Sequence, residues 1–179
     1  MARKSDRAAT ALTARLKQRV ARWGGDLCGV ADIEPLRAIE TIPADLLDPF
    51  TRAVSIAVRV PAGVFETVGD RPTPLYAAVY LTANRLLDDI AFRAAGSVKD
   101  EGFRSLPIPA SQVLDRELWR GAISHKAVAR LAGIGWQGKN LLLITQENAK
   151  LPDVGVPICG VCIKVCPFGR PRERRTVTQ

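Results

Sequence analysis

The sequence of 179 residues predicts one domain of the α+β class, a mixed α/β sandwich, followed by a short tail. Two long segments, 6–23 and 75–95, carry apolar residues at the spacing of three and four that is typical of helices. Residues 53–60 instead alternate between two faces, as a strand does. Helical and extended segments are mixed without a regular βαβ order, which favours this class.

The first quarter of the chain predicts a helix, a strand and a loop. The helix over 6–23 is amphipathic, with Arg and Lys between its apolar positions, and Gly24 and Gly25 end it. Residues 26–32 predict a short strand. Residues 33–51 contain prolines and predict a loop or a short helix.

The central part predicts a strand, a loop and the longest helix. In the strand over 53–60, one face is apolar and the other is mostly small, so we expect a second element to pack closely on the small face. Glycines and prolines predict that 61–74 is a loop. The helix over 75–95 is expected to bury one stripe of side chains: Leu75, Val79, Ala83, Leu86, Ile90 and Ala94.

The last part predicts a short helix between two extended segments. Residues 103–109 are expected to be extended, because they contain two prolines. Ser124 can cap a helix that runs to about Ala132, and Gly133 can end it. The apolar run 141–144 predicts a central strand that is buried on both faces.

Composition excludes several classes of protein. With 47% hydrophobic and 25% charged residues, the chain has an ordinary globular balance, which excludes wholesale disorder, collagen and coiled coil. No apolar run approaches the roughly 20 residues of a membrane helix, and residues 1–7 lack the apolar core of a signal peptide. We therefore expect a cytoplasmic protein without a membrane partner, in which cysteines serve metals or chemistry rather than disulfides.

Positive charge gathers at the two ends of the chain. The net charge is +8, of which residues 1–22 carry +6 and residues 164–179 carry +4, so the body between them is nearly neutral. Basic ends attract polyanions such as tRNA without sequence preference. The alternative is that they serve solubility only, since no aromatic residues lie among them as a base-stacking surface requires.

The glycine-rich segment resembles two phosphate-binding motifs, and we reject both. Gly133, Gly135 and Gly138 spell G-x-G-x-x-G, and Lys139 with Asn140 extends the stretch toward a P-loop. Both motifs need a strand before the glycines and a helix after them, whereas here the expected order is the reverse. The glycines indicate instead a tight turn with a close backbone approach to a ligand or to another segment of the chain. The alternative is a helix-to-strand connection whose tryptophan fills the core.

Three cysteines near the end of the chain have the spacing of iron–sulfur ligands. Cys159, Cys162 and Cys166, the last followed by Pro, form C-x2-C-x3-C-P, the last three ligands of the bacterial ferredoxin run. Val156 stands where the first cysteine of that run would fall. Zinc is the alternative metal, because thiolates suit both, but zinc sites usually use paired C-x2-C motifs. Cys28 is expected to be a small buried residue in its strand.

Residues 123–144 resemble a signature of the epoxyqueuosine reductase family, A-G-x-G-W-x-G-K-[NH]-x-L-[IL]-[IL], and read ISHKAVARLAGIGWQGKNLLLI. Stretches 27–32, 80–89 and 108–112 are also similar to that family, and 157–169 resembles its last cysteine group. The family's enzymes use cobalamin and iron–sulfur clusters and are related to reductive dehalogenases.

The resemblance implies a cobalamin-processing or nitroreductase-like sandwich over 1–150, with a basic N-terminal helix. It implies a vestigial ferredoxin-like segment with iron–sulfur cysteines and a basic tail over 151–179. The reaction would be reductive removal of the epoxide oxygen in tRNA queuosine synthesis, with a [4Fe-4S] cluster, cobalamin, tRNA and an electron-donor protein. The cofactor-binding residues would be His125, Lys126, Gly133, Gly135, Trp136, Gly138, Lys139 and Asn140, and the cluster ligands Cys159, Cys162 and Cys166.

The chain departs from the family's pattern in its cysteine region. Family members carry a complete four-cysteine run after the strand that corresponds to 141–144. Here only residues 145–157 separate that strand from the cysteine group, so the first run is missing. The family's acid beside the tyrosine of the long helix also has no counterpart, because Val79 precedes Tyr80. The second hypothesis is therefore a non-catalytic descendant that binds cobalamin, RNA or a partner protein.

Overall fold

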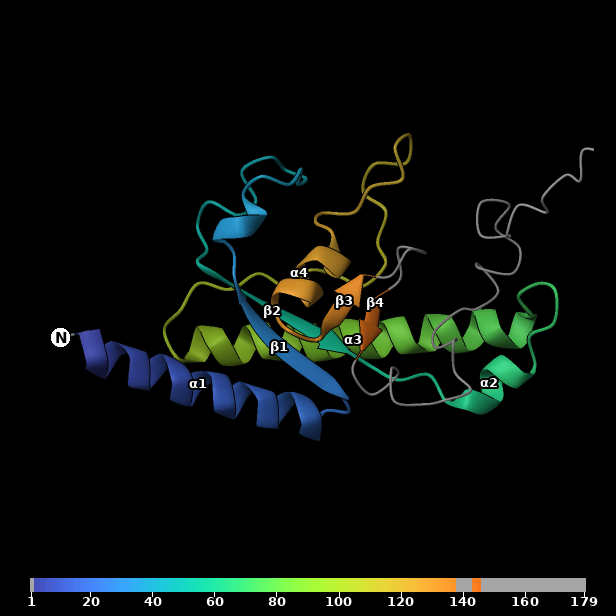
Figure 1. Ribbon diagram of the computed structural model, residues 1–179, viewed down its shortest axis with the longest axis horizontal. Coiled ribbons are helices and arrows are strands. Elements are labelled where there is room, and N and C mark those ends of the chain that lie inside the picture. The colour runs from blue at the N-terminus through green and yellow to red at the C-terminus, as the bar shows by residue number, and fades with distance from the viewer. Residues whose placement is uncertain (1, 138–142, 146–179) are drawn as a thin grey trace, which may run out of the picture.

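The computed structural model describes residues 2–137 and 143–145, and these form helices on a small antiparallel sheet (Figure 1). The predicted α+β class is confirmed. The helices are α1 (Ala2–Arg22), α2 (Ala62–Glu66), α3 (Pro74–Asp100) and α4 (His125–Leu131), and η1 (Glu34–Leu36) is a 3-10 turn. The strands are β1 (Leu27–Asp32), β2 (Arg52–Ala57), β3 (Gly135–Gln137) and β4 (Leu143–Thr145).

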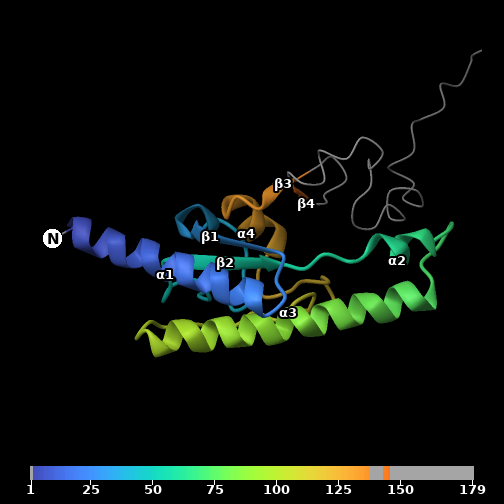
Figure 2. The same ribbon diagram turned by 90° about the horizontal axis from the view of Figure 1, so that it is seen from below.

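Strands β1 and β2 pair antiparallel and separate two layers of helix. Leu27 lies opposite Ala57, and Asp32 lies opposite Arg52. Helices α1 and α3 lie on one face of the pair, and α4 lies on the other (Figure 2). Because side chains alternate along a strand, each strand contributes to both layers.

The face toward α1 and α3 holds a core built by helical periodicity. Its buried members are Leu16 and Val20 of α1 with Ile90 and Ala94 of α3. The sheet contributes Cys28 and Ile56, which are opposite each other in the β1–β2 register and both pack against this core. The alternation predicted for 53–60 therefore places its apolar face here.

The face toward α4 holds a second core, whose buried members are Ile33, Leu36 and Val128. Ala53 of β2 packs against it, so the small face of the strand is covered closely, as predicted. Gly29 of β1 shows how close the approach is. A Cβ at that position would lie 2.3 Å from the carbonyl oxygen of Ala132, just beyond the end of α4.

Several predicted boundaries differ from the structure. Helix α1 begins at Ala2 rather than at residue 6, strand β2 ends at Ala57 rather than at residue 60, and α3 continues to Asp100. Residues 61–74 are not all loop, because α2 begins after Pro61 and its Phe65 ring lies 6.0 Å from that of Tyr76.

The predicted buried stripe of α3 is only partly buried. Ile90 and Ala94 are buried beneath α1, but Leu75 is 54% exposed and Leu86 is 37% exposed. The first half of α3 extends past the β1–β2 sheet, where only α2 lies beside it among the described elements (Figure 1). Helical periodicity identifies the apolar face of a helix. That face is buried only where a neighbouring element packs against it.

The strand predicted at 141–144 is not a central one in the described structure. Strand β4 covers 143–145 and pairs antiparallel with β3, in a two-stranded sheet separate from β1 and β2. The predicted division of the chain at residue 150 lies outside the described residues. Among the helices of the described part, none is long and apolar enough to cross a membrane.

Candidate functional site

Helix α4 is held as the sequence predicts, with a polar cap at its start and a glycine after its end. The Ser124 hydroxyl accepts a hydrogen bond from the backbone N–H of Ala127 at 3.3 Å. Gly133 has a φ of +72°, the left-handed conformation that favours glycine after a helix. Both signals are local, and they fix which residues begin and end α4.

His125, at the first position of α4, faces residues from two other segments. Its ring is hydrogen-bonded to the carbonyl of Pro109 and lies within electrostatic reach of Asp88 in α3. The residue as a whole is exposed, but these neighbours remove water from part of the ring. This desolvation lowers the pKa of His125, and the Pro109 hydrogen bond and the Asp88 charge oppose it.

Asp88 and Tyr80 tie α3 to the segment that contains Pro109. The Asp88 carboxylate accepts a hydrogen bond from the backbone N–H of Ala110 at 2.6 Å. The Tyr80 hydroxyl and the Ser111 hydroxyl are 2.8 Å apart and share a hydrogen bond. Tyr80 is also stacked beside Tyr76, with ring centroids 6.3 Å apart. The stretches 80–89 and 108–112 therefore lie together in space.

We name the group formed by Tyr80, Asp88, Ser111 and His125 the α3–α4 polar cluster. Sequence reasoning placed His125 in a site but gave Asp88 and Ser111 no role. Asp88 could have been found from its spacing. It follows Tyr80 by about two helical turns, which places the two residues near the same side of α3.

The predicted cofactor-binding residues fall into two groups at opposite ends of α4. His125 and Lys126 begin the helix, whereas Gly133, Gly135 and Trp136 follow its end. At a rise of 1.5 Å per residue, about 12 Å of chain along the helix separates position 125 from position 133. Gly138, Lys139 and Asn140 lie outside the described residues.

The alternative interpretation of the glycine-rich segment expected Trp136 to fill the core, and the structure shows that it does not. Its side chain is 44% exposed on β3, and Ile134, which is 8% exposed, supplies the buried contact instead. An exposed indole at this place is available for contact with a ligand or another segment. The order of helix before strand that excluded both phosphate-binding motifs is confirmed.

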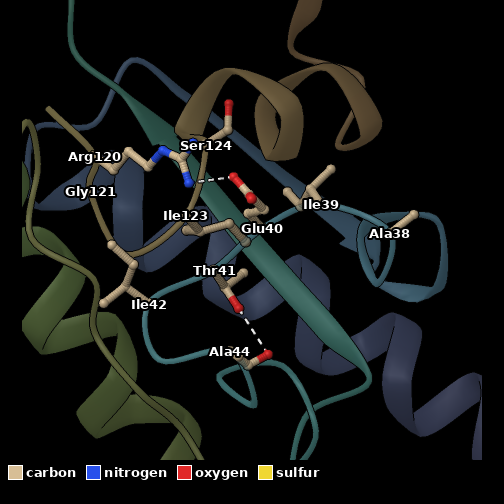
Figure 3. A pocket seen from close by; sticks show the side chains of 10 residues that line it. All are labelled: Ala38, Ile39, Glu40, Thr41, Ile42, Ala44, Arg120, Gly121, Ile123 and Ser124. Atoms are coloured by element: carbon tan, nitrogen blue, oxygen red, sulfur yellow. Dashed lines mark hydrogen bonds and ion pairs between the residues drawn. The ribbon is translucent and has the colours of Figure 1, made fainter. Parts of the chain in front are cut away.

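A hollow of about 570 Å³ lies beside the start of α4 (Figure 3). It is bordered by the loop around Thr41 and by the segment from Arg120 to Ser124. An ion pair between Arg120 and Glu40 crosses it. Ser124 borders the hollow, but none of the predicted cofactor-binding residues within 2–137 does.

The predicted cluster ligands Cys159, Cys162 and Cys166 lie outside the described residues. Within residues 2–137 and 143–145 there is no group of three His, Cys, Asp or Glu side chains that could hold a metal ion. Cys28 is half-buried, close to the prediction, and burial raises the pKa of its thiol while the nearby Lys17 charge opposes the rise. A thiol held in its protonated form is a poor metal ligand.

Comparison with known proteins gives a short match. No protein-family model and no solved structure matches the chain. An epoxyqueuosine reductase of Listeria monocytogenes (serovar 1/2a) is 39% identical over 66 residues. The match covers 27% of this chain and 17% of that protein, so the chain spans about one sixth of the relative's length.

The match also contains a gap in this chain. Since 27% of 179 residues is about 48, the 66 aligned positions include about 18 without a counterpart here. The chain is therefore similar to a part of an epoxyqueuosine reductase, with fewer residues than that part of the relative.

Proposed function

We propose that the chain belongs to the epoxyqueuosine reductase family as a shortened form and acts as an iron–sulfur oxidoreductase in tRNA queuosine synthesis. The observation that carries the proposal is the 39% identity to an epoxyqueuosine reductase. The cysteine pattern C-x2-C-x3-C-P supports it. We also propose a cytoplasmic location, because thiols stay reduced there.

The donor set suits an iron–sulfur cluster with one open position. Cys159, Cys162 and Cys166 would supply three thiolates, and the fourth position would be filled by a partner or stay open. Residues 151–179 would form this segment, and residues 1–150 the cofactor-binding domain. When bound, a cluster supplies electrons and cobalamin supplies the reactive cobalt centre.

The α3–α4 polar cluster would orient the substrate or cofactor beside α4. His125 has a lowered pKa, which favours the neutral ring. One nitrogen of a neutral imidazole donates a hydrogen bond, here to Pro109, and the other is then an acceptor. The ring can therefore accept a hydrogen bond from an amide or hydroxyl of a bound group, while the Tyr80 and Ser111 hydroxyls can donate or accept one.

The test is anaerobic reconstitution with iron and sulfide. We expect brown protein with a broad visible absorption band, and iron and sulfide that co-purify with it. Cys162→Ser should lose the colour, and Cys28→Ser, which changes a thiol on the α1–α3 face, should keep it. Colourless wild-type protein, or zinc at unit stoichiometry without sulfide, would contradict the proposal.

The shortened cysteine region favours a second candidate, a non-catalytic descendant that binds cobalamin, RNA or a partner protein. Titration with cob(II)alamin tests the cobalamin pocket that both candidates can share. A retained pocket predicts a spectral change on binding, which Lys139→Ala should weaken without loss of stability. Only the first predicts that the reconstituted protein, with a reductant and an electron-donor protein, reduces epoxyqueuosine in tRNA.

A further inference from the structure

Helix α1 carries a stripe of positive charge along one side. Positions 4, 15 and 22 are separated by 11 and 7 residues, which correspond to about three and two turns of 3.6 residues. These three positions therefore lie on one line along the helix, and Arg7 and Arg19 lie near that line. We name Lys4, Arg7, Arg15, Arg19 and Arg22 the α1 basic stripe; it is about 27 Å long at 1.5 Å per residue.

The positive charge at the amino end of α1 does not serve the stability of the helix. Cations are favourable at the carboxyl end of a helix and unfavourable at the amino end. Arg19 and Arg22 are in the last turn, where they fit the helix dipole, but Arg3 and Lys4 are in the first turn, which contains no acidic residue. The charge at the amino end therefore needs another explanation.

The stripe lies beside the buried face of α1 and does not overlap it. Leu16 and Val20 pack against α3, whereas Arg15 and Arg22 are exposed. Glu101, which follows the end of α3, pairs with Arg15 at 2.9 Å. The first turns of α1 extend past the end of α3 (Figure 1). The exposed Arg15 and Arg22 are thus accessible to a large partner.

We infer that the α1 basic stripe binds the phosphate backbone of RNA. Closely spaced cations along a helix match the closely spaced phosphates of a nucleic acid, and the attraction needs no base contact. A membrane surface fits less well. A basic amphipathic helix binds a membrane by burying its apolar side, and here that side is already buried against α3.

This inference deepens the proposed function, because the proposed substrate is a nucleoside in tRNA. It names a surface separate from the candidate site, since α1 and α4 lie on opposite faces of the β1–β2 sheet. Changes in the stripe should therefore leave cofactor binding unaltered. A failure of RNA binding at α1 can then be distinguished from a failure of the redox proposal.

The experiment measures binding of the full chain to a fluorescein-labelled tRNA anticodon stem–loop by anisotropy, over a series of salt concentrations. The test variant is Lys4→Gln with Arg22→Gln. The matched control is Arg3→Gln with Lys17→Gln, which removes one Lys and one Arg from the same helix, away from the line of positions 4, 15 and 22. A third variant, Lys4→Arg with Arg22→Lys, keeps the charge.

We expect the test variant to bind at least about tenfold more weakly, with a salt slope smaller by about 2, because each lost phosphate contact removes about 0.9 from the slope. The control and the charge-preserving variant should bind like the wild type, and circular dichroism should show equal helix content. Equal weakening in the test and control variants, or no RNA binding at all, would overturn the inference. So would binding to phosphatidylserine vesicles, but not to RNA, that depends on Lys4 and Arg22.

Discussion

The two faces of the β1–β2 sheet are covered in different ways. On one face, two long helices bury Leu16, Val20, Ile90 and Ala94 at regular helical spacing. On the other, the seven-residue α4 and the turn η1 pack around Ile33, Leu36 and Val128. The first face is a core made by long periodic elements. The second is made by short elements brought close to the sheet, and its α4 contributes His125 to the candidate site, to which α3 contributes Tyr80 and Asp88.

This difference suggests that the two faces have different roles. Of the predicted cofactor-binding residues that the structure describes, none lies on the α1–α3 face, and all lie at the two ends of α4. Short connecting segments tolerate changes in conformation, which suits binding. The predictions below test whether the first face supplies mainly stability and the second mainly the geometry of the site.

The largest effect is expected from Ile90→Ala, on the face of the long helices. Ile90 is fully buried between α1 and α3, and truncating a buried isoleucine costs about 2–5 kcal/mol. Urea unfolding should show the loss. The control is Leu81→Ala on the same helix, where the side chain is 56% exposed and the change should be small. Equal losses in the two variants would show that the α1–α3 core is not formed as described.

Gly29→Ala should destabilise the opposite face. Its Cβ would lie 2.3 Å from the Ala132 carbonyl oxygen, a backbone atom, so α4 must shift away from the sheet. Overpacking of this kind typically costs about 1–3 kcal/mol. Gly96→Ala is the matched control, because an added Cβ meets nothing within 4 Å in the interior of α3. That variant should gain about 0.5–1 kcal/mol of helix stability.

Binding of cob(II)alamin by the same two variants compares the two faces of the β1–β2 sheet directly. Under the proposed function, Gly29→Ala should also weaken binding of cob(II)alamin, since it displaces the helix that carries the candidate residues. Ile90→Ala, measured under conditions in which it stays folded, should bind normally. The reverse result would place the binding surface on the α1–α3 face.

Asp88→Ala should have a moderate effect, because it leaves the backbone N–H of Ala110 without its acceptor. Hydrogen bonds to charged groups contribute about 1.5–3 kcal/mol when buried, and partial exposure here reduces that to about 1 kcal/mol. Asp88→Asn keeps an acceptor oxygen and should recover most of the loss. If the two variants lose equal stability, the charge rather than the hydrogen bond is responsible.

The smallest effect is expected from the pH dependence contributed by His125. Its pKa is lowered in the folded protein, so the unfolded chain binds the proton first as pH falls. The contribution to stability is complete above the unfolded pKa of about 6.5 and is lost as pH falls from there through the folded pKa. His125→Asn should remove this loss, so the wild type should lose stability relative to the variant as pH falls, which urea unfolding over a pH series measures.

NMR gives a direct check, because His125 is the chain's single histidine and its ring signals need no assignment. The midpoint of their titration should lie below that of a free histidine, and Asp88→Asn should lower it further, since the Asp88 charge raises it. A midpoint above the ordinary value would contradict the described surroundings of His125.

Much of the fold could be predicted from local patterns. The helix ends at Ser124 and Gly133 follow from a side-chain cap and a left-handed glycine, which depend on adjacent residues only. The faces of β2 follow from alternation. Burial along α3 could not be predicted in the same way. Leu75 and Ile90 belong to one periodic stripe, yet only Ile90 lies under α1.

The candidate site could be predicted in part. The resemblance singled out 80–89, 108–112 and the segment that begins at His125, but nothing in their order along the chain says that they meet. Asp88 and Ser111 become partners in the site only because the segment after α3 turns back along that helix. The three cysteines and residues 138–140 remain predictions.

The sequence by itself determined the two long helices and the strands β1 and β2, which of their faces are apolar, and where α4 begins and ends. These features depend on steric preferences and hydrogen bonds between residues a few positions apart. The tertiary structure alone decided that α4 lies against Gly29, that Trp136 is exposed, and that His125 lies near Asp88. Those contacts join residues far apart in the chain, and they depend on how closely the layers pack rather than on any local preference.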